Sequence, residues 1–110
     1  VQVEDKDTSA DSLLGGIGFN NQYTLAMVEK FADEHLLISE EEIIDGMFYV
    51  FDKHQLIVEG AAAVGVGALV NQKIEVHGKR VVTLLSGSSI NSNEYIRIIH
   101  SRLKGNEKQG

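Results

Sequence analysis

The sequence predicts a small α/β domain, a partial three-layer α/β/α arrangement in which helices flank a small, mainly parallel sheet. The chain has 110 residues, of which 43% are hydrophobic and 24% are charged, and this balance indicates one globular domain rather than a disordered chain. Apolar residues recur at helical spacing in several segments. Residues 81–85 are hydrophobic without alternation, as is typical of a parallel strand covered on both faces.

The first regular elements are expected between residues 22 and 38. Met27, Val28 and Phe31 follow the spacing of an amphipathic helix, which predicts a helix over 22–35 with its charged residues outside. Residues 36–38 then form a short apolar run that suits a buried strand.

A capping box predicts the start of the second helix. Ser39 precedes three glutamates, and in this motif the serine oxygen accepts a hydrogen bond from the backbone N–H of Glu42. The Glu42 side chain in turn accepts one from the serine N–H. The helix is expected to fray near residues 53–55. Its predicted buried stripe consists of Ile44, Met47, Phe48 and Phe51.

Small residues dominate the next helical segment. Residues 61–70 are alanine, valine, glycine and leucine only, which predicts a buried helix closely packed by its neighbours. Glycine costs about 1 kcal/mol relative to alanine in a helix, so close packing has to compensate. The strand expected at 81–85 follows a polar turn.

A last helix is expected after the strand. Asn91 and Glu94 can cap it. Its predicted apolar stripe consists of Tyr95, Ile96, Ile99 and Leu103. Gly105 opens a polar tail, so the domain is expected to cover residues 1–105 and the tail 106–110.

Charge and composition exclude several classes of function. The net charge is −6, the wrong sign for a surface that neutralises phosphates, so no nucleic-acid partner is expected. The longest apolar stretch is about half the length needed to cross a bilayer, so no membrane partner is expected. The absence of cysteine favours a reducing, cytoplasmic compartment. Because the chain begins at Val1 and lacks proline, we consider a fragment of a longer protein.

Few residues carry a chemical signal on their own. The four histidines are at least 19 positions apart, so no metal site is predicted. Ser86 follows the strand expected at 81–85, where open α/β sheets bind ligands, although a plain Ser/Gly turn is the alternative. Glu59 is a lone carboxylate between apolar segments, and its alternative role is a helix N-terminal charge satisfied by backbone N–H groups.

Three stretches of the chain resemble a known enzyme family. They are VQVEDKDTSADSLLGGIGFNNQYT, then ISEEEIIDGMFYVFDKHQLIVEGAAAVGVGALV, then KRVVTLLSGSSIN. In this order they resemble the C-terminal part of threonine dehydratases and their relatives, including serine racemases and hydroxyectoine-utilisation dehydratases. The likeness covers residues 1 to about 92. It implies pyridoxal phosphate as cofactor and the fold of the tryptophan synthase β subunit.

The resemblance also implies roles for individual residues. Ser86 would place its hydroxyl against the pyridine nitrogen of the cofactor, with Gly87 beside it. A neutral hydroxyl does not hold the ring nitrogen protonated, which weakens the electron sink and favours β-elimination. The segment formed by Gly16, Ile17 and Gly18 would pass beside cofactor and substrate. Glu59 would lie on the ring side of the site.

The chain also departs from the family pattern. After Gly87 it continues with Ser88-Ser89, where relatives commonly have glycine and asparagine. The Schiff-base lysine and the glycine-rich phosphate loop of these enzymes have no counterpart here. We therefore expect the chain alone to be inactive and to need the N-terminal remainder of the enzyme. The complete enzyme is expected to be a homo-oligomer that acts on a small amino acid. A non-catalytic α/β association or regulatory module is the alternative.

Overall fold

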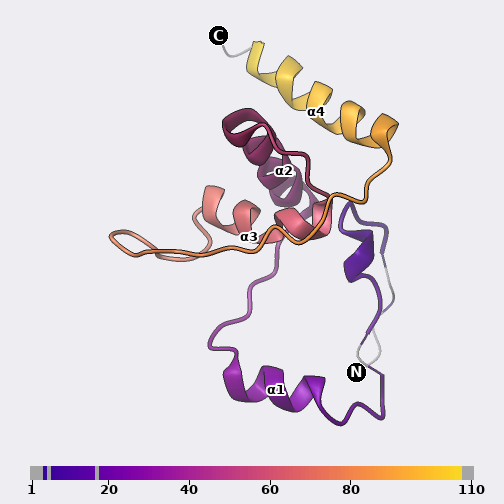
Figure 1. Cartoon of the computed structure of the whole chain (residues 1–110), viewed down its shortest axis with the longest axis vertical. Helices are drawn as coiled ribbons and strands as arrows, with labels where there is room; N and C mark the ends of the chain where they lie inside the picture. The colour runs from indigo at the N-terminus through magenta and orange to yellow at the C-terminus, as the bar shows by residue number, and fades with distance from the viewer. Residues whose placement is uncertain (1–3, 5, 17, 108–110) are drawn as a thin grey trace.

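The architecture is helical rather than α/β. The computed structural model describes residues 4, 6–16 and 18–107. Its elements are the 3-10 helix η1 (Asp11–Leu13) and the helices α1 (Thr24–Phe31), α2 (Glu40–His54), α3 (Gly60–Val70) and α4 (Ser92–Glu107). No strand occurs within these described ranges (Figure 1). The predicted α/β/α arrangement with a parallel sheet is therefore wrong.

The two predicted strands are irregular segments that lack a partner. Residues 36–38 and 81–85 form no β-ladder with any described part of the chain. Several of their side chains stay in solvent, with Leu37 92% exposed and Val82 95% exposed, whereas Ile38 packs against the core. A strand needs a neighbour to receive its backbone N–H and C=O groups. Local hydrophobicity alone does not supply that neighbour.

The predicted capping box at the start of α2 is confirmed. The Ser39 hydroxyl accepts from the backbone N–H of Glu42 at 3.3 Å, and the Glu42 carboxylate accepts from the Ser39 N–H at 2.8 Å. The helix ends within the range predicted for fraying, because Gln55 adopts a left-handed conformation with φ 53°. Both ends of α2 thus follow from local sequence.

Helices α2 and α3 touch backbone to backbone. A methyl group in place of the Gly46 hydrogen would meet the Ala63 carbonyl oxygen and the Gly67 backbone of α3. Gly67 in turn faces the Glu42 carbonyl oxygen. The prediction that α3 is a buried helix of small residues is confirmed, with its start at Gly60. The glycines permit an approach that larger residues forbid.

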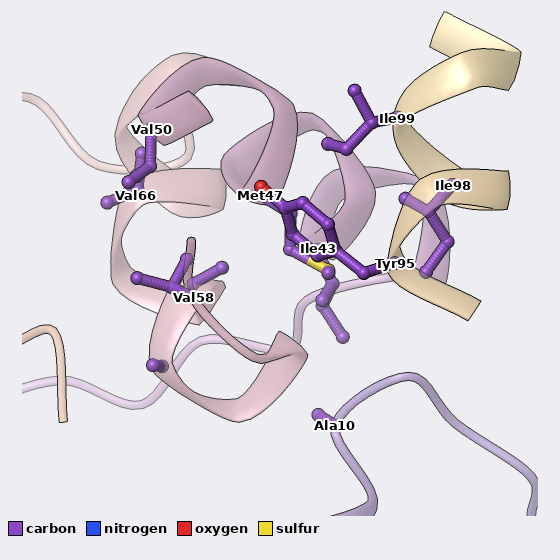
Figure 2. Close-up of a cluster of buried hydrophobic side chains, with 11 residues drawn as sticks. Ala10, Ile43, Met47, Val50, Val58, Val66, Tyr95, Ile98 and Ile99 are labelled. Atoms are coloured by element: carbon purple, nitrogen blue, oxygen red, sulfur yellow. The ribbon is translucent and has the colours of Figure 1, made fainter. Parts of the chain in front are cut away.

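The core lies between α2, α3 and α4. Met47 is fully buried at its centre, between Val50 and Val66 on one side and α4 on the other (Figure 2). From α4, Tyr95 contributes a ring set edge-on to Phe51 at 6.4 Å between centroids. The core residues are Ala10, Ile43, Met47, Val50, Val58, Ala62, Ala63, Val66, Tyr95, Ile98 and Ile99.

The orientation of α4 differs from the predicted stripe. Ile98 is buried in place of Ile96, which is 63% exposed, and Leu103 is also exposed. Arg102 fixes the helix on α2 through ion pairs to Glu41 and Asp45 at 2.6 and 3.2 Å. The helix continues to Glu107, so the tail expected from Gly105 is helical at its start.

Helix α1 is shorter than the predicted 22–35 and buries none of its residues. Met27 and Phe31, which form its apolar face, are 58% and 64% exposed. The helix contacts none of the other described helices and lies apart from them (Figure 1). The periodicity therefore predicted a helix correctly, but the expected burial of its apolar face was wrong.

The molecule keeps a large surface for its mass. It exposes 8881 Å², whereas a folded 12.1 kDa monomer exposes about 6,000 Å². Its radius of gyration of 15.7 Å also exceeds the value of about 13 Å typical of a domain this long. Much apolar surface, including the face of α1, is thus available for contact.

Candidate functional site

Three segments meet at the start of α3. The backbone N–H of Glu59 donates to the Gly87 carbonyl oxygen at 3.1 Å. The Glu59 carboxylate accepts from the Ser12 hydroxyl at 3.2 Å and from the Ser89 backbone N–H at 3.4 Å. We call this meeting point of Ser12, Glu59, Gly60, Gly87 and Ser89 the α3 junction. Figure 1 shows the start of α3 beside η1 and the chain that leads into α4.

Two glycines make the α3 junction possible. A Cβ at Gly60 would collide with the Ser9 carbonyl group, and a Cβ at Gly87 would collide with the Glu59 carboxylate. A glycine at position 87 is therefore explained by packing within the protein, because it leaves room for the Glu59 carboxylate. Its predicted contact with a cofactor stays a prediction.

Ser86 lies next to the α3 junction and is exposed. The segment 81–85 brings it there by passing over α3, where Thr83 lies against Gly65. The predicted turn at 86–89 is thus held in place by Glu59 rather than by a sheet.

The structure does not surround Gly16 and Gly18 with other groups. Nothing lies within 4 Å of a Cβ built at either residue. Gly15 before them has φ 98°, a conformation that L side chains rarely adopt. The loop follows η1, whose Ser12 reaches Glu59. Ile17, predicted with these glycines, lies outside the described residues.

The hollow at the α3 junction is small and acidic. It measures about 150 Å³ and is lined by Asp11, Glu59 and Glu94 together with hydroxyl and amide groups. A shallower hollow of about 370 Å³ adjoins it at Asp11, Ser12, Glu59 and Ser89. Carboxylates on its wall disfavour a phosphate group by like-charge repulsion. Within the described part of the chain, no group of three or more metal-binding side chains forms.

A larger apolar hollow lies beside the segment that leads to Ser86. It measures about 440 Å³, within the size range of small-molecule pockets. Residues of α2, α3 and 81–85 line it: Tyr49, Val50, His54, Val66, Leu69, Val70, Thr83 and Leu85. It offers packing surface but few polar groups.

The acidic hollow at the α3 junction does not suit the phosphate of pyridoxal phosphate. Ser86 is exposed beside that junction, and its contact with a ring nitrogen stays a prediction. Lys6, Lys30, Lys53, Lys73, Lys79 and Lys104 are all exposed, and Lys108 lies outside the described residues. Lys73 is held by Glu42 and by the Leu37 carbonyl oxygen at 2.9 and 2.8 Å. Exposure to solvent keeps the six described lysines from being enclosed by the apolar groups that activate an amine.

Sequence reasoning missed the serines that complete the α3 junction. Ser12 and Ser89 were not predicted as site residues, yet both donate to Glu59. Ser9 donates from its backbone to Glu40 of α2 at 2.8 Å. Burial alone would raise the pKa of Glu40, but the hydrogen bonds from Ser9 and Thr8 outweigh it and lower that pKa. Serine is common in turns, so the residue type carried no signal for these pairs.

Comparison with known proteins places the chain among dehydratase-like sequences. It is 35% identical over 98% of its length to a Sinorhizobium fredii protein that carries a threonine dehydratase name. It is 38% identical over 93% of its length to the L-threonine ammonia-lyase of Thermotoga maritima. The L-threo-3-hydroxyaspartate ammonia-lyase of Saccharomyces cerevisiae is 27% identical over 76% of the chain. No protein-family model matches.

These relatives confirm the resemblance found in the sequence motifs. The chain covers 32%, 25% and 26% of the three proteins, so it spans about a quarter to a third of their length.

None of the helices in the described part of the chain combines the length and the hydrophobicity needed to span a membrane.

Proposed function

We propose that this chain, a relative of the threonine dehydratases and threonine ammonia-lyases, is the C-terminal portion of a pyridoxal-phosphate-dependent dehydratase. The reaction is β-elimination from a hydroxy amino acid such as threonine or serine, which yields a 2-oxo acid and ammonia. The observation that carries this proposal is identity of 35–38% to such proteins over 93–98% of the chain.

Ser86 is the residue proposed to meet the cofactor ring. Pyridoxal phosphate, when bound, supplies an electron sink for the bonds at the substrate α-carbon. The exposed Ser86 hydroxyl offers a neutral hydrogen bond to the ring nitrogen and no negative charge to keep that nitrogen protonated. This environment favours loss of a β-leaving group over racemisation. Gly16, Ile17 and Gly18 are proposed to pass beside the substrate.

The chain requires the remainder of the enzyme for activity. Its described lysines are all exposed to solvent, so the Schiff-base lysine comes from the rest of the polypeptide. The extra exposed surface supports this role, because apolar groups on α1 and 81–85 can be covered by that remainder. We propose a cytoplasmic homo-oligomer as the complete enzyme.

A non-catalytic association or regulatory module is the second candidate. The observation that favours it is the uncovered apolar face of α1, with Met27 and Phe31 in solvent. Such a module would bind a protein partner through this face and would not need a lysine.

The test compares the 110-residue chain with the longer reading frame that contains it. Each is mixed with pyridoxal phosphate, reduced with borohydride and assayed for 2-oxo acid release from threonine and serine. We expect a stoichiometric lysine adduct and turnover only in the longer protein. Turnover by the 110-residue chain would refute its dependence on the remainder, and absence of both signals in the longer protein would favour the association module.

A further inference from the structure

Glu59 connects segments that are far apart in the sequence. Its carboxylate accepts from Ser12, 47 positions earlier, and from Ser89, 30 positions later. We propose that Glu59 is a positioning residue, which holds the Ser86–Ser89 turn against the η1 segment and does not itself contact the cofactor. The identity of the ligand bound by this turn rests on the proposed function, whereas the positioning role of Glu59 is independent of it.

The side chain of Glu59 is committed to these contacts rather than to its helix. Glu59 is the N-cap residue of α3, yet it makes no side-chain capping bond. Capping would be the ordinary use of an oxygen at this position. Both carboxylate oxygens instead accept from groups outside α3, and the Glu59 backbone N–H adds a bond to Gly87. Glu59 therefore forms three hydrogen bonds to two separate segments of the chain.

Gly87 gives an independent sign of this role. The carboxylate of Glu59 occupies the space in which a Cβ at position 87 would lie. An alanine at this position would push the carboxylate away from the Ser89 N–H. The structure thus predicts that Gly87→Ala and Glu59→Ala disturb the same hydrogen bond, so their effects on Ser89 overlap instead of adding.

The role can be measured without any cofactor. Amide hydrogen exchange of the ¹⁵N-labelled chain is recorded for Ser89 in Glu59→Ala, Glu59→Gln, Gly87→Ala and the Glu59→Ala/Gly87→Ala double variant. Loss of a hydrogen bond to a charged group is expected to speed Ser89 exchange about tenfold in both alanine variants, with little further change in the double variant. Glu59→Gln keeps an oxygen acceptor and is expected to restore most of the protection.

Two further variants make the test specific. Glu29→Ala removes an exposed carboxylate on α1 and is expected to leave Ser89 unchanged. Ser12→Ala removes only the contact to η1 and is expected to keep the helices intact in far-UV circular dichroism while the η1 segment loosens. Unchanged Ser89 exchange in Glu59→Ala, or additive effects in the double variant, would overturn the positioning role.

A second measurement separates this inference from the proposed function. In the longer enzyme, the dissociation constant for pyridoxal phosphate is expected to rise in Glu59→Ala and to return toward that of the parent in Glu59→Gln. If Ser89 exchange responds as predicted while Glu59→Ala and Ser86→Ala both leave cofactor affinity unchanged, the positioning role stands and the assignment of the turn to the cofactor fails.

Discussion

Substitution of Gly46 by alanine tests the backbone contact between α2 and α3. The added Cβ would lie 2.5 Å from the Ala63 carbonyl oxygen and 2.7 Å from the Gly67 nitrogen. Ordinary contact begins at 3.4 Å, so the helices have to separate by about 0.9 Å. A gap of that size forfeits about a quarter to a half of the dispersion energy of the atoms that lose contact. Backbone atoms cannot rotate out of the way.

The size of the effect follows from two opposing terms. Overpacking costs about 1–3 kcal/mol, and the upper end applies because both obstructing atoms belong to the backbone. Replacing a helical glycine by alanine returns about 1 kcal/mol of helix propensity. The expected net loss is about 2 kcal/mol in the free energy of unfolding, or about 8 °C in Tm for a chain of this length.

The assay is thermal and urea unfolding followed by far-UV circular dichroism. Gly105→Ala is the matched control, because it makes the same chemical change in α4 where a Cβ meets nothing within 4 Å. The control is expected to stabilise the protein by up to about 1 kcal/mol. A Gly46→Ala variant as stable as the parent would refute the close approach of the two backbones.

Three other perturbations have defined outcomes. Tyr95→Phe removes a buried hydroxyl that has no hydrogen-bond partner among the described residues. The variant is expected to leave stability unchanged or raise it by up to about 1 kcal/mol, and a clear fall in the urea midpoint would contradict this. Hydrogen bonds from the Ser39 backbone and from Lys73 lower the pKa of Glu42. Because that pKa lies below its unfolded value, the ionised Glu42 side chain stabilises the fold above about pH 5, and this stabilisation is lost as the pH falls through the glutamate range. Glu42→Gln should therefore flatten the dependence of unfolding free energy on pH between pH 6 and 3. In the longer enzyme, Ser86→Ala is expected to weaken pyridoxal phosphate binding by up to about tenfold, measured by fluorescence titration. Ser86→Asp should instead shift the products from elimination toward racemisation or transamination, measured by chiral chromatography.

Local interactions could be predicted from the sequence, and non-local ones could not. Ser39 and Glu42 are three positions apart, so their mutual capping is visible in the order of residues. Residues 81–85 have the hydrophobicity of a strand, but strand formation depends on a neighbour that the described chain does not provide. Likewise, the spacing of Met27 and Phe31 predicts a helix without saying what covers it.

The same distinction applies to the candidate site. Glu59 and Gly87 both stood out, the first as a lone carboxylate and the second beside Ser86. Their contact, across 28 positions, depends on the path of the chain around α3 and has no signature in the sequence. Ser12 and Ser89 were missed for the same reason.

The glycines of α3 each face a different neighbour, and this arrangement has a consequence for how the helix can vary. Gly60 meets the Ser9 backbone, Gly65 meets Thr83, and Gly67 meets the Glu42 carbonyl oxygen. Residue size at these positions is therefore limited from three directions around one short helix. Substitutions along α3 should be tolerated according to the width available at each position rather than according to hydrophobicity, so a valine at Gly67 should be rejected although it is apolar.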